Sequence, residues 1–572
     1  IYAIALTPGV KLPFEPADEL QATDTTTAKP ATGAAVTITL AGIQQRLVEV
    51  PAPPGNYSDL TATDKRLFWI ERATSLPRKA SLMELDITSD EPKPKALVED
   101  IAGYEPSADG KKLGVHKGGA FYVIASSAPT PAKLDDAKVD LSGWTFTVDP
   151  QEDWRQVFVD SWRLERDYFY DRGMHGVDWK AMLAKYLPLV ARVTTREELS
   201  DIQAQMAGEL SALHTFVRGG DVRKGPEDVR TATLGALLVR DEAAGGYRVR
   251  HIYRSDPDLP DELSPLARYG VNVSEGDVIT GVNGVATLAV PDIGALLRDQ
   301  ADKQARLTIR AGARGPAGAE RDVIVRPISA ARDADLRYAE WEYTRRLAVD
   351  SLTKGSVGYV HLRAMGPSDV TEWYRDFYPV FNRQGLIIDA RHNRGGNIES
   401  WILEKLIRKA WMYWQPRVGD PYWNMQYAFR GHVVLLVDHL TASDGEAFAE
   451  GFRRLGIGKI IGTRTWGGEI WLSQSNVLVD RGIVTAAENG VYGPEGKWLI
   501  EGHGVDPDSV VDNLPHGTYE GHDAQLDAAV AYLTGEIKRD PRPVPPHPPY
   551  PNKASPDNRL KADSNGNVKR EQ

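Results

Sequence analysis

The junction between a strand and a helix near residue 443 constrains this chain more than any other feature. Residues 433–437 are an unbroken aliphatic run, too short for an isolated helix, and predict a strand buried on both faces. Residues 441–445 (Thr-Ala-Ser-Asp-Gly) predict a turn, and apolar residues return at helical spacing after Glu446. A buried strand that turns directly into a helix is typical of an α/β fold, so we expect one here.

Ser443 lies at that junction, where two interpretations are open. The first N–H groups of a helix have no partner within the helix and carry partial positive charge, so they stabilise an oxyanion. A hydroxyl there can act as a nucleophile whose own loop holds the tetrahedral intermediate. In the simpler interpretation Ser443 only caps the helix, and Glu446 three residues later completes a capping box.

A second junction of the same kind precedes the first. Residues 385–390 predict another buried strand, a polar and glycine-containing turn follows, and residues 398–410 predict a helix. Gly395 and Gly396 in that turn let the backbone present N–H groups without obstruction from side chains. If the two strands are parallel, both turns lie at the carboxyl edge of one sheet, where α/β sites are found. We therefore predict an oxyanion hole made by Gly395 or Gly396 together with Asp444.

Length and composition exclude several classes of function. The 572 residues exceed a single core and indicate three or four domains. A net charge of −11 without a basic stripe argues against nucleic-acid binding, and the lack of cysteine excludes disulfides and a cysteine nucleophile. No apolar run reaches the length of a membrane span, so we expect no membrane partner. Because the chain begins at Ile1, in what resembles a strand already under way, we expect a fragment or a processed product.

The first quarter of the chain predicts short strands separated by turns. A Pro-, Thr- and Asp-rich stretch to about Gly33 is expected to be an exposed loop. Six strands are then predicted: Val36–Leu40, Gln45–Val50, Arg66–Ile70, Ala80–Asp86, Lys112–Val115 and Ala120–Ile124. Such a meander fits one or two blades of a β-propeller, which cannot close a ring by themselves.

Residues 153–213 predict helices, one of which starts at a capping box formed by Thr195 and Glu198. From Tyr343 to Leu533, strands and helices alternate, which predicts an α/β core with parallel strands. The end of the chain, from Pro541, is rich in proline and then polar, and predicts an extended or disordered tail.

Residues 230–327, between those two regions, predict a separate β unit with a helix near Ile293–Arg298. The run Gly-Asp-Val-Ile-Thr-Gly-Val-Asn-Gly at 276–284 resembles the core of a PDZ domain. The segment that matches the carboxylate-binding loop of that fold is Leu234, Gly235, Ala236 and Leu237. Free N–H groups beside a sheet edge can capture the end of a peptide there, although the unit could also be a spacer that binds nothing.

Three short motifs follow one another in the α/β region. They are residues 389–396 (Asp-Ala-Arg-His-Asn-Arg-Gly-Gly), 441–446 (Thr-Ala-Ser-Asp-Gly-Glu) and 461–468 (Ile-Gly-Thr-Arg-Thr-Trp-Gly-Gly). Their order and spacing resemble the superfamily that contains carboxy-terminal processing peptidases and the tricorn protease. The resemblance covers about residues 153–533 and implies a ClpP/crotonase-like catalytic core with a serine nucleophile.

The two branches of that superfamily activate the serine differently. Carboxy-terminal processing peptidases use a lysine in a turn after the nucleophile, but the corresponding residue here is Gly468. The tricorn branch takes a histidine from the end of the helical segment, which His214 matches, and a glutamate, which Glu501 matches. The resemblance therefore implies that His214 takes the Ser443 proton and returns it to the leaving amine, while Glu501 orients and stabilises the imidazolium.

One position departs from the tricorn pattern. In the archaeal tricorn protease a serine precedes the catalytic histidine and links it to the glutamate, whereas Leu213 occupies that position here. Three routes from Glu501 to His214 are then open: a direct contact, a water, or Thr215.

The remaining histidines raise the possibility of a metal hydrolase, and the aromatic residues raise that of a substrate pocket. The histidines available to a metal have no HExxH or similar spacing, so we expect no metal and no other cofactor; they are His392, His432, His439 and His503. The aromatic residues at 411–414, with Tyr422 and Trp423 after them, line either a substrate pocket or the core.

Together these patterns predict a multidomain chain. Its parts are a partial β-propeller and linker at 1–145, a helical catalytic subdomain at 146–222, a PDZ-like domain at 228–330, an α/β serine peptidase core at 335–538 and a disordered proline-rich tail at 539–572.

The predicted function is hydrolysis of peptides through an acyl-enzyme on Ser443. By resemblance, the substrates are oligopeptides released by larger proteases, and the assembly is a homo-oligomer, hexameric in the family, in the cytoplasm; the periplasm is the alternative if N-terminal sequence is missing. Two rivals remain. One is a Ser/Lys peptidase that uses Lys459 or Lys497, and the other is a non-catalytic PDZ and propeller scaffold that binds peptide termini.

Overall fold

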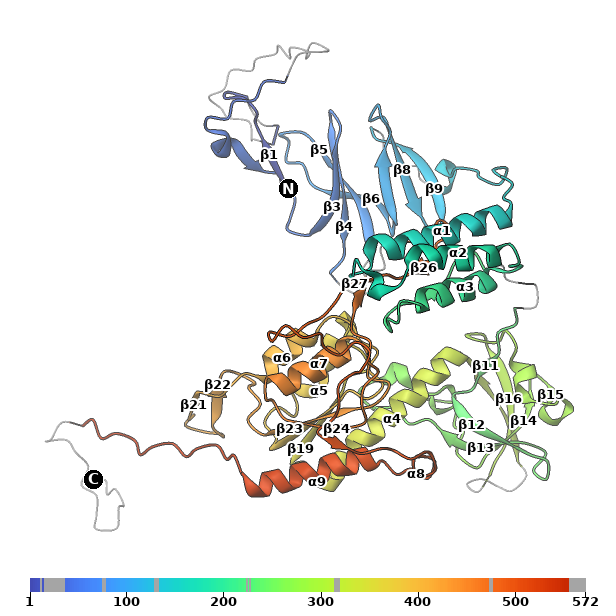
Figure 1. Ribbon diagram of the computed structural model, residues 1–572, viewed down its shortest axis with the longest axis vertical. Helices are drawn as coiled ribbons and strands as arrows, with labels where there is room; N and C mark the ends of the chain where they lie inside the picture. The colour runs from blue at the N-terminus through green and yellow to red at the C-terminus, as the bar shows by residue number, and fades with distance from the viewer. Residues whose placement is uncertain are drawn as a thin grey trace. The chain divides into compact units, whose positions relative to one another are not determined.

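The computed structural model describes residues 1–10, 13–14, 36–74, 79–127, 133–222, 225, 228–312, 319–472 and 477–554. The chain divides into two compact units, Ile1–Val148 and Asp149–Gln572. Figure 1 follows the chain from the N-terminal strands in blue to the last helix in red.

The N-terminal unit is built from antiparallel sheets. A four-stranded sheet contains β3 (Asn56–Ala62), β4 (Arg66–Arg72), β5 (Ala80–Asp86) and β6 (Lys95–Glu99), and a three-stranded sheet contains β7 (Gly103–Pro106), β8 (Lys112–Lys117) and β9 (Ala120–Ala125). A short pair joins β1 (Tyr2–Ile4) to β2 (Leu47–Glu49). Phe68, Leu82 and Leu113 belong to one core shared by the two larger sheets. These sheets confirm the meander of short antiparallel strands expected from the sequence.

The strand predicted at Val36–Leu40 was wrong, because those residues adopt no regular structure. Val36 is 75% exposed and Leu40 is 76% exposed, so no sheet face covers them. The sequence also gave no sign of β3, where a bulge between Ser58 and Thr61 interrupts the alternation of side chains. The loop predicted up to Gly33 lies for the most part outside the described residues.

The second unit begins with three helices. They are α1 (Pro150–Tyr168), α2 (Trp179–Val190) and α3 (Arg196–Gly208), which pack around a core that includes Phe158, Leu199 and Met206. The predicted capping box is confirmed: the Thr195 hydroxyl accepts the Glu198 N–H, and the Glu198 carboxylate accepts the Thr195 N–H. Ile470, Leu478 and Val484 of a later segment complete this core.

The PDZ-like domain is an antiparallel sheet in the order β12-β13-β14-β16-β17, with β15 beside β14. The strands are β12 (Ala236–Asp241), β13 (Gly246–Ile252), β14 (Val278–Val282), β15 (Val285–Ala286), β16 (Ala305–Arg310) and β17 (Glu320–Val325). A separate pair joins β11 (Ala232–Thr233) and β18 (Ile328–Ser329). The helix expected near Ile293–Arg298 is a short 3-10 helix, Ile293–Leu297: the Asp292 carboxylate caps its start at the Gly294 N–H, and the backbone becomes extended at Arg298.

The α/β core is a parallel sheet in the order β19-β20-β23-β24-β28 between two layers of helices (Figure 1). The strands are β19 (Val357–His361), β20 (Gly385–Asp389), β23 (His432–Val437), β24 (Lys459–Gly462) and β28 (Ser509–Val510). One layer contains α4 (Ala330–Thr353) and α9 (Ala524–Arg539), and the other contains α5 (Pro367–Phe377), α6 (Glu399–Leu406) and α7 (Asp444–Arg454). The predicted parallel pairing of the two buried strands is confirmed.

Helix α6 is shorter than predicted and ends at Leu406. The chain then enters a hairpin of β21 (Met412–Trp414) and β22 (Tyr422–Asn424), where the Trp411 N–H bonds the Asn424 carbonyl. Trp423 is buried, as expected of a core residue, whereas Trp411 is 68% exposed.

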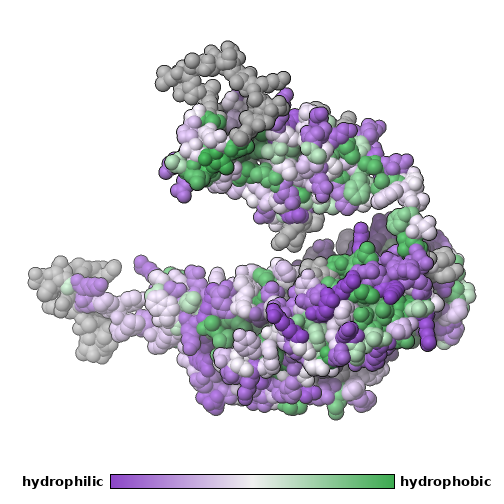
Figure 2. Space-filling view, turned by 45° about the horizontal axis from the view of Figure 1, so that its top comes forward, coloured by the Kyte–Doolittle hydropathy of each residue, from purple (hydrophilic) through white to green (hydrophobic). Residues whose placement is uncertain are grey.

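Residues 541–554 contain no helix or strand, and residues 555–572 lie outside the described part of the chain. Within the described part of the chain, none of the helices combines the length and hydrophobicity needed to span a bilayer. The face drawn in Figure 2 mixes hydrophilic and hydrophobic residues.

Candidate active site

Ser443 occupies a strained position between β23 and α7. Its φ of 54° and ψ of −128° lie in a region that residues other than glycine seldom adopt. The Ser443 side chain makes no capping hydrogen bond to the helix, while the Ser443 N–H donates to the Glu446 carboxylate at 3.1 Å. The hydroxyl of this half-buried residue is therefore not committed to the helix, as a simple cap would be.

The turn at residues 390–397 lies directly against the turn at residues 438–443. We name them the oxyanion turn and the nucleophile turn after the roles predicted from the sequence. A Cβ added to Gly395 would lie 2.5 Å from Ser443 Cβ and 2.9 Å from Ser443 Oγ, and its φ is +78°. Only glycine fits this approach. The parallel strands β20 and β23 place both turns at the carboxyl edge of the sheet, as the sequence predicts.

The backbone N–H groups near Ser443 differ in their engagement. The Gly395 N–H donates to Asn393 Oδ1 at 2.8 Å, so it is used within its own turn. The N–H groups of Gly396 and Asp444 donate to no group among the described residues. Of the predicted donors, Gly396 and Asp444 are thus the ones free to stabilise an oxyanion.

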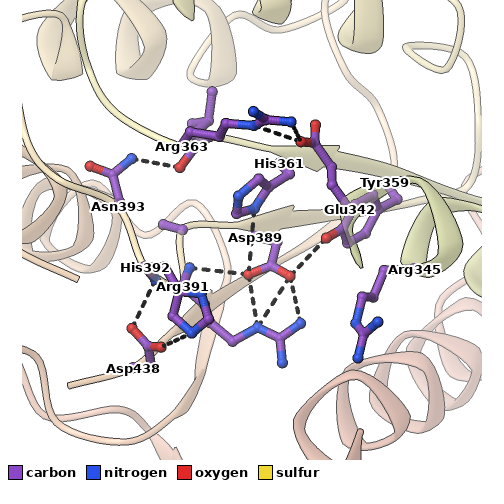
Figure 3. Close-up of polar contacts among 12 residues, drawn as sticks. Glu342, Arg345, Tyr359, His361, Arg363, Asp389, Arg391, His392, Asn393 and Asp438 are labelled. Atoms are coloured by element: carbon purple, nitrogen blue, oxygen red, sulfur yellow. Dashed lines mark hydrogen bonds and ion pairs between the residues drawn. The ribbon is translucent and has the colours of Figure 1, made fainter. Parts of the chain in front are cut away.

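Arg391 and His392 hold the beginning of the oxyanion turn (Figure 3). The buried Arg391 guanidinium bonds Asp389 at 2.6 Å and Asp523 at 2.7 Å. The His392 ring lies 3.0 Å from an Asp438 oxygen, and the His392 N–H also donates to Asp438. The turn is fixed by side chains from three separate segments, and His392 serves here as a partner for a carboxylate.

Glu446 links the nucleophile turn to the next turn, residues 465–468. Its carboxylate accepts the Thr465 hydroxyl at 2.6 Å, the Gly467 N–H at 2.6 Å and the Gly468 N–H at 2.9 Å. Burial raises the pKa of Glu446, while these donors oppose the shift. The sequence suggested only a capping role for this residue, because its distant partners are not visible in a local pattern.

His214 lies after α3, with its ring edge-on to Phe216 and Trp466. Its Nδ1 is 2.6 Å from the Ile470 carbonyl oxygen, which can only accept, so Nδ1 carries the proton and Nε2 is left as a base. Burial lowers the pKa of His214, although the Ile470 carbonyl and the Glu501 charge oppose that shift. No hydrogen bond joins the ring to the Ser443 hydroxyl in this structure, although the Trp466 N–H bonds the Thr441 carbonyl beside the nucleophile.

Glu501 contacts the backbone on both sides of the histidine. Its carboxylate accepts the Leu213 N–H at 2.8 Å, the Glu469 N–H at 2.9 Å and the Ile470 N–H at 3.2 Å. Of the three routes left open by the sequence, a direct hydrogen bond from Glu501 to the His214 ring does not occur among the described residues, and the Thr215 hydroxyl donates to the Ala212 carbonyl at 3.3 Å. Leu213 has no side-chain hydroxyl, and its contact with Glu501 is made by its backbone N–H.

Two further carboxyl groups lie near the nucleophile. Burial raises the pKa of Asp444 to about 8, and its carboxylate accepts N–H groups of Ile398 and Glu399 at the start of α6. Burial also raises the pKa of Glu469 to about 10. These shifts favour the protonated acids near neutral pH, which would limit the negative charge beside Ser443.

The two lysines of the rival mechanism lie elsewhere. Lys459 is the first residue of β24, at the opposite end of the sheet from the nucleophile turn, and its ammonium lies 5.1 Å from the centre of the Tyr532 ring. Lys497 is exposed in a tight turn. The position that holds a lysine in the other branch is Gly468, whose N–H is bonded to Glu446.

The segment predicted to bind a peptide carboxylate is partly covered. Leu234 and Gly235 are buried, and a Cβ on Gly235 would lie 2.7 Å from Pro265 and 3.0 Å from the Ser264 hydroxyl. Ala236 and Leu237 begin β12, which is an edge strand, and Leu237 is 50% exposed. An extended peptide could add to this edge.

Family comparisons agree with this order of parts. Residues 150–208 match the tricorn protease C1 domain, residues 232–330 match the tricorn protease PDZ domain, and residues 356–511 match peptidase family S41.

Individual relatives match most of the chain. Tricorn protease homolog 1 of Streptomyces coelicolor is 32% identical over 531 residues, which is 90% of this chain and 48% of that protein. The tricorn protease of Thermoplasma acidophilum is 29% identical over 475 residues, 82% of this chain and 43% of that protein. A crystal structure of the tricorn protease superposes with a TM-score of 0.80 at 26% identity, covering 94% of this chain and 51% of the other. The chain therefore spans about half the length of these relatives, and it belongs to the tricorn protease family.

Proposed function

We propose that this chain is a serine peptidase that cleaves peptides through an acyl-enzyme on Ser443. The observation that carries the proposal is the meeting of two turns at the carboxyl edge of the sheet. There the uncommitted Ser443 hydroxyl lies against Gly395, beside the unpaired N–H groups of Gly396 and Asp444.

In the proposed reaction, Ser443 Oγ attacks the carbonyl carbon of the scissile peptide bond while its proton passes to His214 Nε2. The N–H groups of Gly396 and Asp444 stabilise the oxyanion. The carbon–nitrogen bond then breaks, and the imidazolium gives its proton to the leaving amine. A water molecule, deprotonated by the same ring, hydrolyses the ester and restores the serine.

Contact between Ser443 and His214 belongs to the substrate complex in this proposal. Catalytic hydrogen bonds are often long in free enzymes and shorten when substrate binds. The Ile470 carbonyl keeps the reactive nitrogen of the ring unprotonated until then. Glu501, which holds both the Leu213 and the Ile470 backbone, maintains that geometry and adds negative charge that favours the imidazolium.

We further propose that the substrates are oligopeptides released by larger proteases, and that the protein works as a homo-oligomer, a hexamer, in the cytoplasm. The loop at 234–237 and the edge of β12 would hold peptide ends. The divisions at 145, 222, 330 and 538 are proposed as domain boundaries. The mass of the purified protein by light scattering tests the hexamer.

Labelling with a fluorophosphonate probe, followed by peptide mapping, tests the mechanism. We expect the label on Ser443 in the native protein, none in Ser443→Ala, and very slow labelling in His214→Ala. Rapid labelling of His214→Ala would support the Ser/Lys rival. Peptide binding that is unchanged in Ser443→Ala, with no labelling and no turnover in the native protein, would instead support the scaffold.

A further inference from the structure

Asn393 lies at the point where three strand ends meet. Its side chain is completely buried. Nδ2 donates to the Leu362 carbonyl at 2.7 Å, just after β19 (Figure 3). Oδ1 accepts the Gly395 N–H at 2.8 Å, just after β20. Its backbone carbonyl accepts the Ala442 N–H at 2.9 Å, one residue before the nucleophile.

The nucleophile helix also touches this side chain. A Cβ added to Gly445 would lie 2.8 Å from Asn393 Oδ1 and 3.2 Å from Asn393 Cβ. The amide therefore fills the space between Gly395 on one side and Gly445 on the other. Movement of the oxyanion turn or of the start of α7 would have to displace the Asn393 side chain.

The hydrogen bond from Gly395 has a second consequence. It takes the Gly395 N–H out of use, so that of the two glycines only Gly396 keeps a free donor. The position of Gly396 is in turn fixed from the other side, since a Cβ there would overlap the Met365 carbonyl oxygen at 1.9 Å. The direction of the remaining N–H thus depends on where Asn393 holds the turn.

We propose that Asn393 is the positioning residue of the oxyanion hole: it selects Gly396 over Gly395 as the donor and fixes the spacing between that donor and Ser443. This inference rests on the proposed peptidase function. The residue touches no reacting atom, and it acts through the backbone of the two turns. Both of its amide atoms are needed, because one anchors the side chain to Leu362 and the other holds Gly395.

A pair of matched inhibitors tests this role. A peptide aldehyde forms a hemiacetal oxyanion with the serine, whereas the corresponding peptide alcohol binds without one. In Asn393→Ala we expect kcat and aldehyde affinity to fall together by roughly 10²-fold, the scale of one lost oxyanion donor, with KM and alcohol affinity changed little. Asn393→Asp keeps the acceptor for Gly395 but loses the donor to Leu362, and we expect an intermediate loss.

Gln203 supplies the control, because it is also a completely buried amide, bonded to Ser161 and Arg196 in the helical subdomain. We expect Gln203→Ala to lower the melting temperature while the ratio of aldehyde to alcohol affinity stays as in the native protein. A purely structural role for Asn393 predicts the same result for Asn393→Ala, and that result would overturn the proposal.

Gly445→Ala provides a second variant in which Asn393 remains. Gly445 is helical, so alanine suits its backbone, and the clash with the Asn393 amide is the expected cost. We expect Gly445→Ala to reduce kcat by about 10-fold in the native background, and to have a smaller effect in Asn393→Ala. Fully additive effects would contradict the proposed contact. If the native protein does not react with a fluorophosphonate, the proposed peptidase function is wrong. If the native protein reacts but Asn393→Ala behaves like Gln203→Ala, only the role of Asn393 is wrong.

Discussion

Ser443 and His214 are held by different kinds of structure. Ser443 follows a strand buried in the centre of a parallel sheet, and its strained backbone is fixed by Glu446 and by the adjacent oxyanion turn. The histidine follows the last turn of α3, between a 44% exposed Leu213 and a half-buried Thr215. Among the described residues, its ring has a single hydrogen-bond partner, the carbonyl of Ile470.

The difference indicates a division of tasks. Stabilising an oxyanion requires donors that do not reorganise, which suits the buried turns around Ser443. A general base has to approach the nucleophile and then turn its proton toward the leaving group, which suits a ring held through a single hydrogen bond. We therefore expect substitutions near Ser443 to act through geometry, and substitutions near His214 to act through protonation.

The largest expected effect tests whether the two regions act as one unit. Ser443→Ala and His214→Ala should each reduce kcat by on the order of 10⁴-fold or more, and the double variant should lose little beyond either single one. Steady-state assays with a fluorogenic peptide measure this. Losses that multiply would mean that the histidine does not serve the serine.

The second-largest expected effect concerns the spacing between the two turns around Ser443. Gly395→Ala places a Cβ 2.5 Å from Ser443 Cβ, so we expect kcat/KM to fall by roughly 10²- to 10³-fold, as when an oxyanion donor is lost. Gly270→Ala is the control, because its φ is +85° but nothing lies within 4 Å of the added Cβ. It should carry the backbone strain alone and leave kcat/KM unchanged.

The pH dependence tests the protonation side. In the proposed mechanism His214 is a neutral base, so kcat/KM should fall only as the pH drops through its pKa, which burial moves below the usual value of about 6.5. Glu501→Gln removes charge that favours the imidazolium, so the acid limb should move to still lower pH while kcat falls roughly 10- to 100-fold. The loss is smaller than for a carboxylate bonded to the ring, because the Ile470 carbonyl still sets the tautomer. An acid limb that stays in place or moves to higher pH would contradict this assignment.

The smallest effect on activity concerns the helical subdomain that carries the histidine. Burial raises the pKa of Glu165 to about 8, and both of its carboxyl oxygens are without a partner among the described residues. The folded state therefore favours the protonated acid, and stability should decline as the pH rises from about 4.5 toward about 8.

Glu165→Gln should consequently melt at a higher temperature than the native protein at pH values of about 8, with the gain shrinking toward about 5. Scanning calorimetry across that range measures it. Glu152→Gln, an exposed change in the same helix, should alter neither the melting temperature nor its pH dependence. Equal responses of the two variants would show that burial at Glu165 is not the cause.

Much of the fold could be predicted because it is written in local patterns. The aliphatic runs at 385–390 and 433–437 predicted two buried parallel strands, and the Thr195–Glu198 spacing predicted a helix start. The strand predicted at Val36–Leu40 failed because hydrophobic alternation does not by itself supply a partner strand. The helix predicted to run from Ile398 to Ala410 ends at Leu406, because the residues that follow enter the hairpin of β21 and β22.

The sequence by itself determined where the candidate site residues lie along the chain. A serine lies at a strand-to-helix turn, two glycines lie in the turn after the neighbouring strand, and a histidine and a glutamate lie in segments that match the tricorn pattern. Only the tertiary structure decided how they connect. It commits the Gly395 N–H to Asn393, directs Glu446 to the turn at 465–468, and brings Glu501 to the Leu213 N–H across 288 residues of sequence. Hydrogen bonds between distant backbone groups depend on how whole elements pack, and neighbouring residues in the sequence carry no record of that.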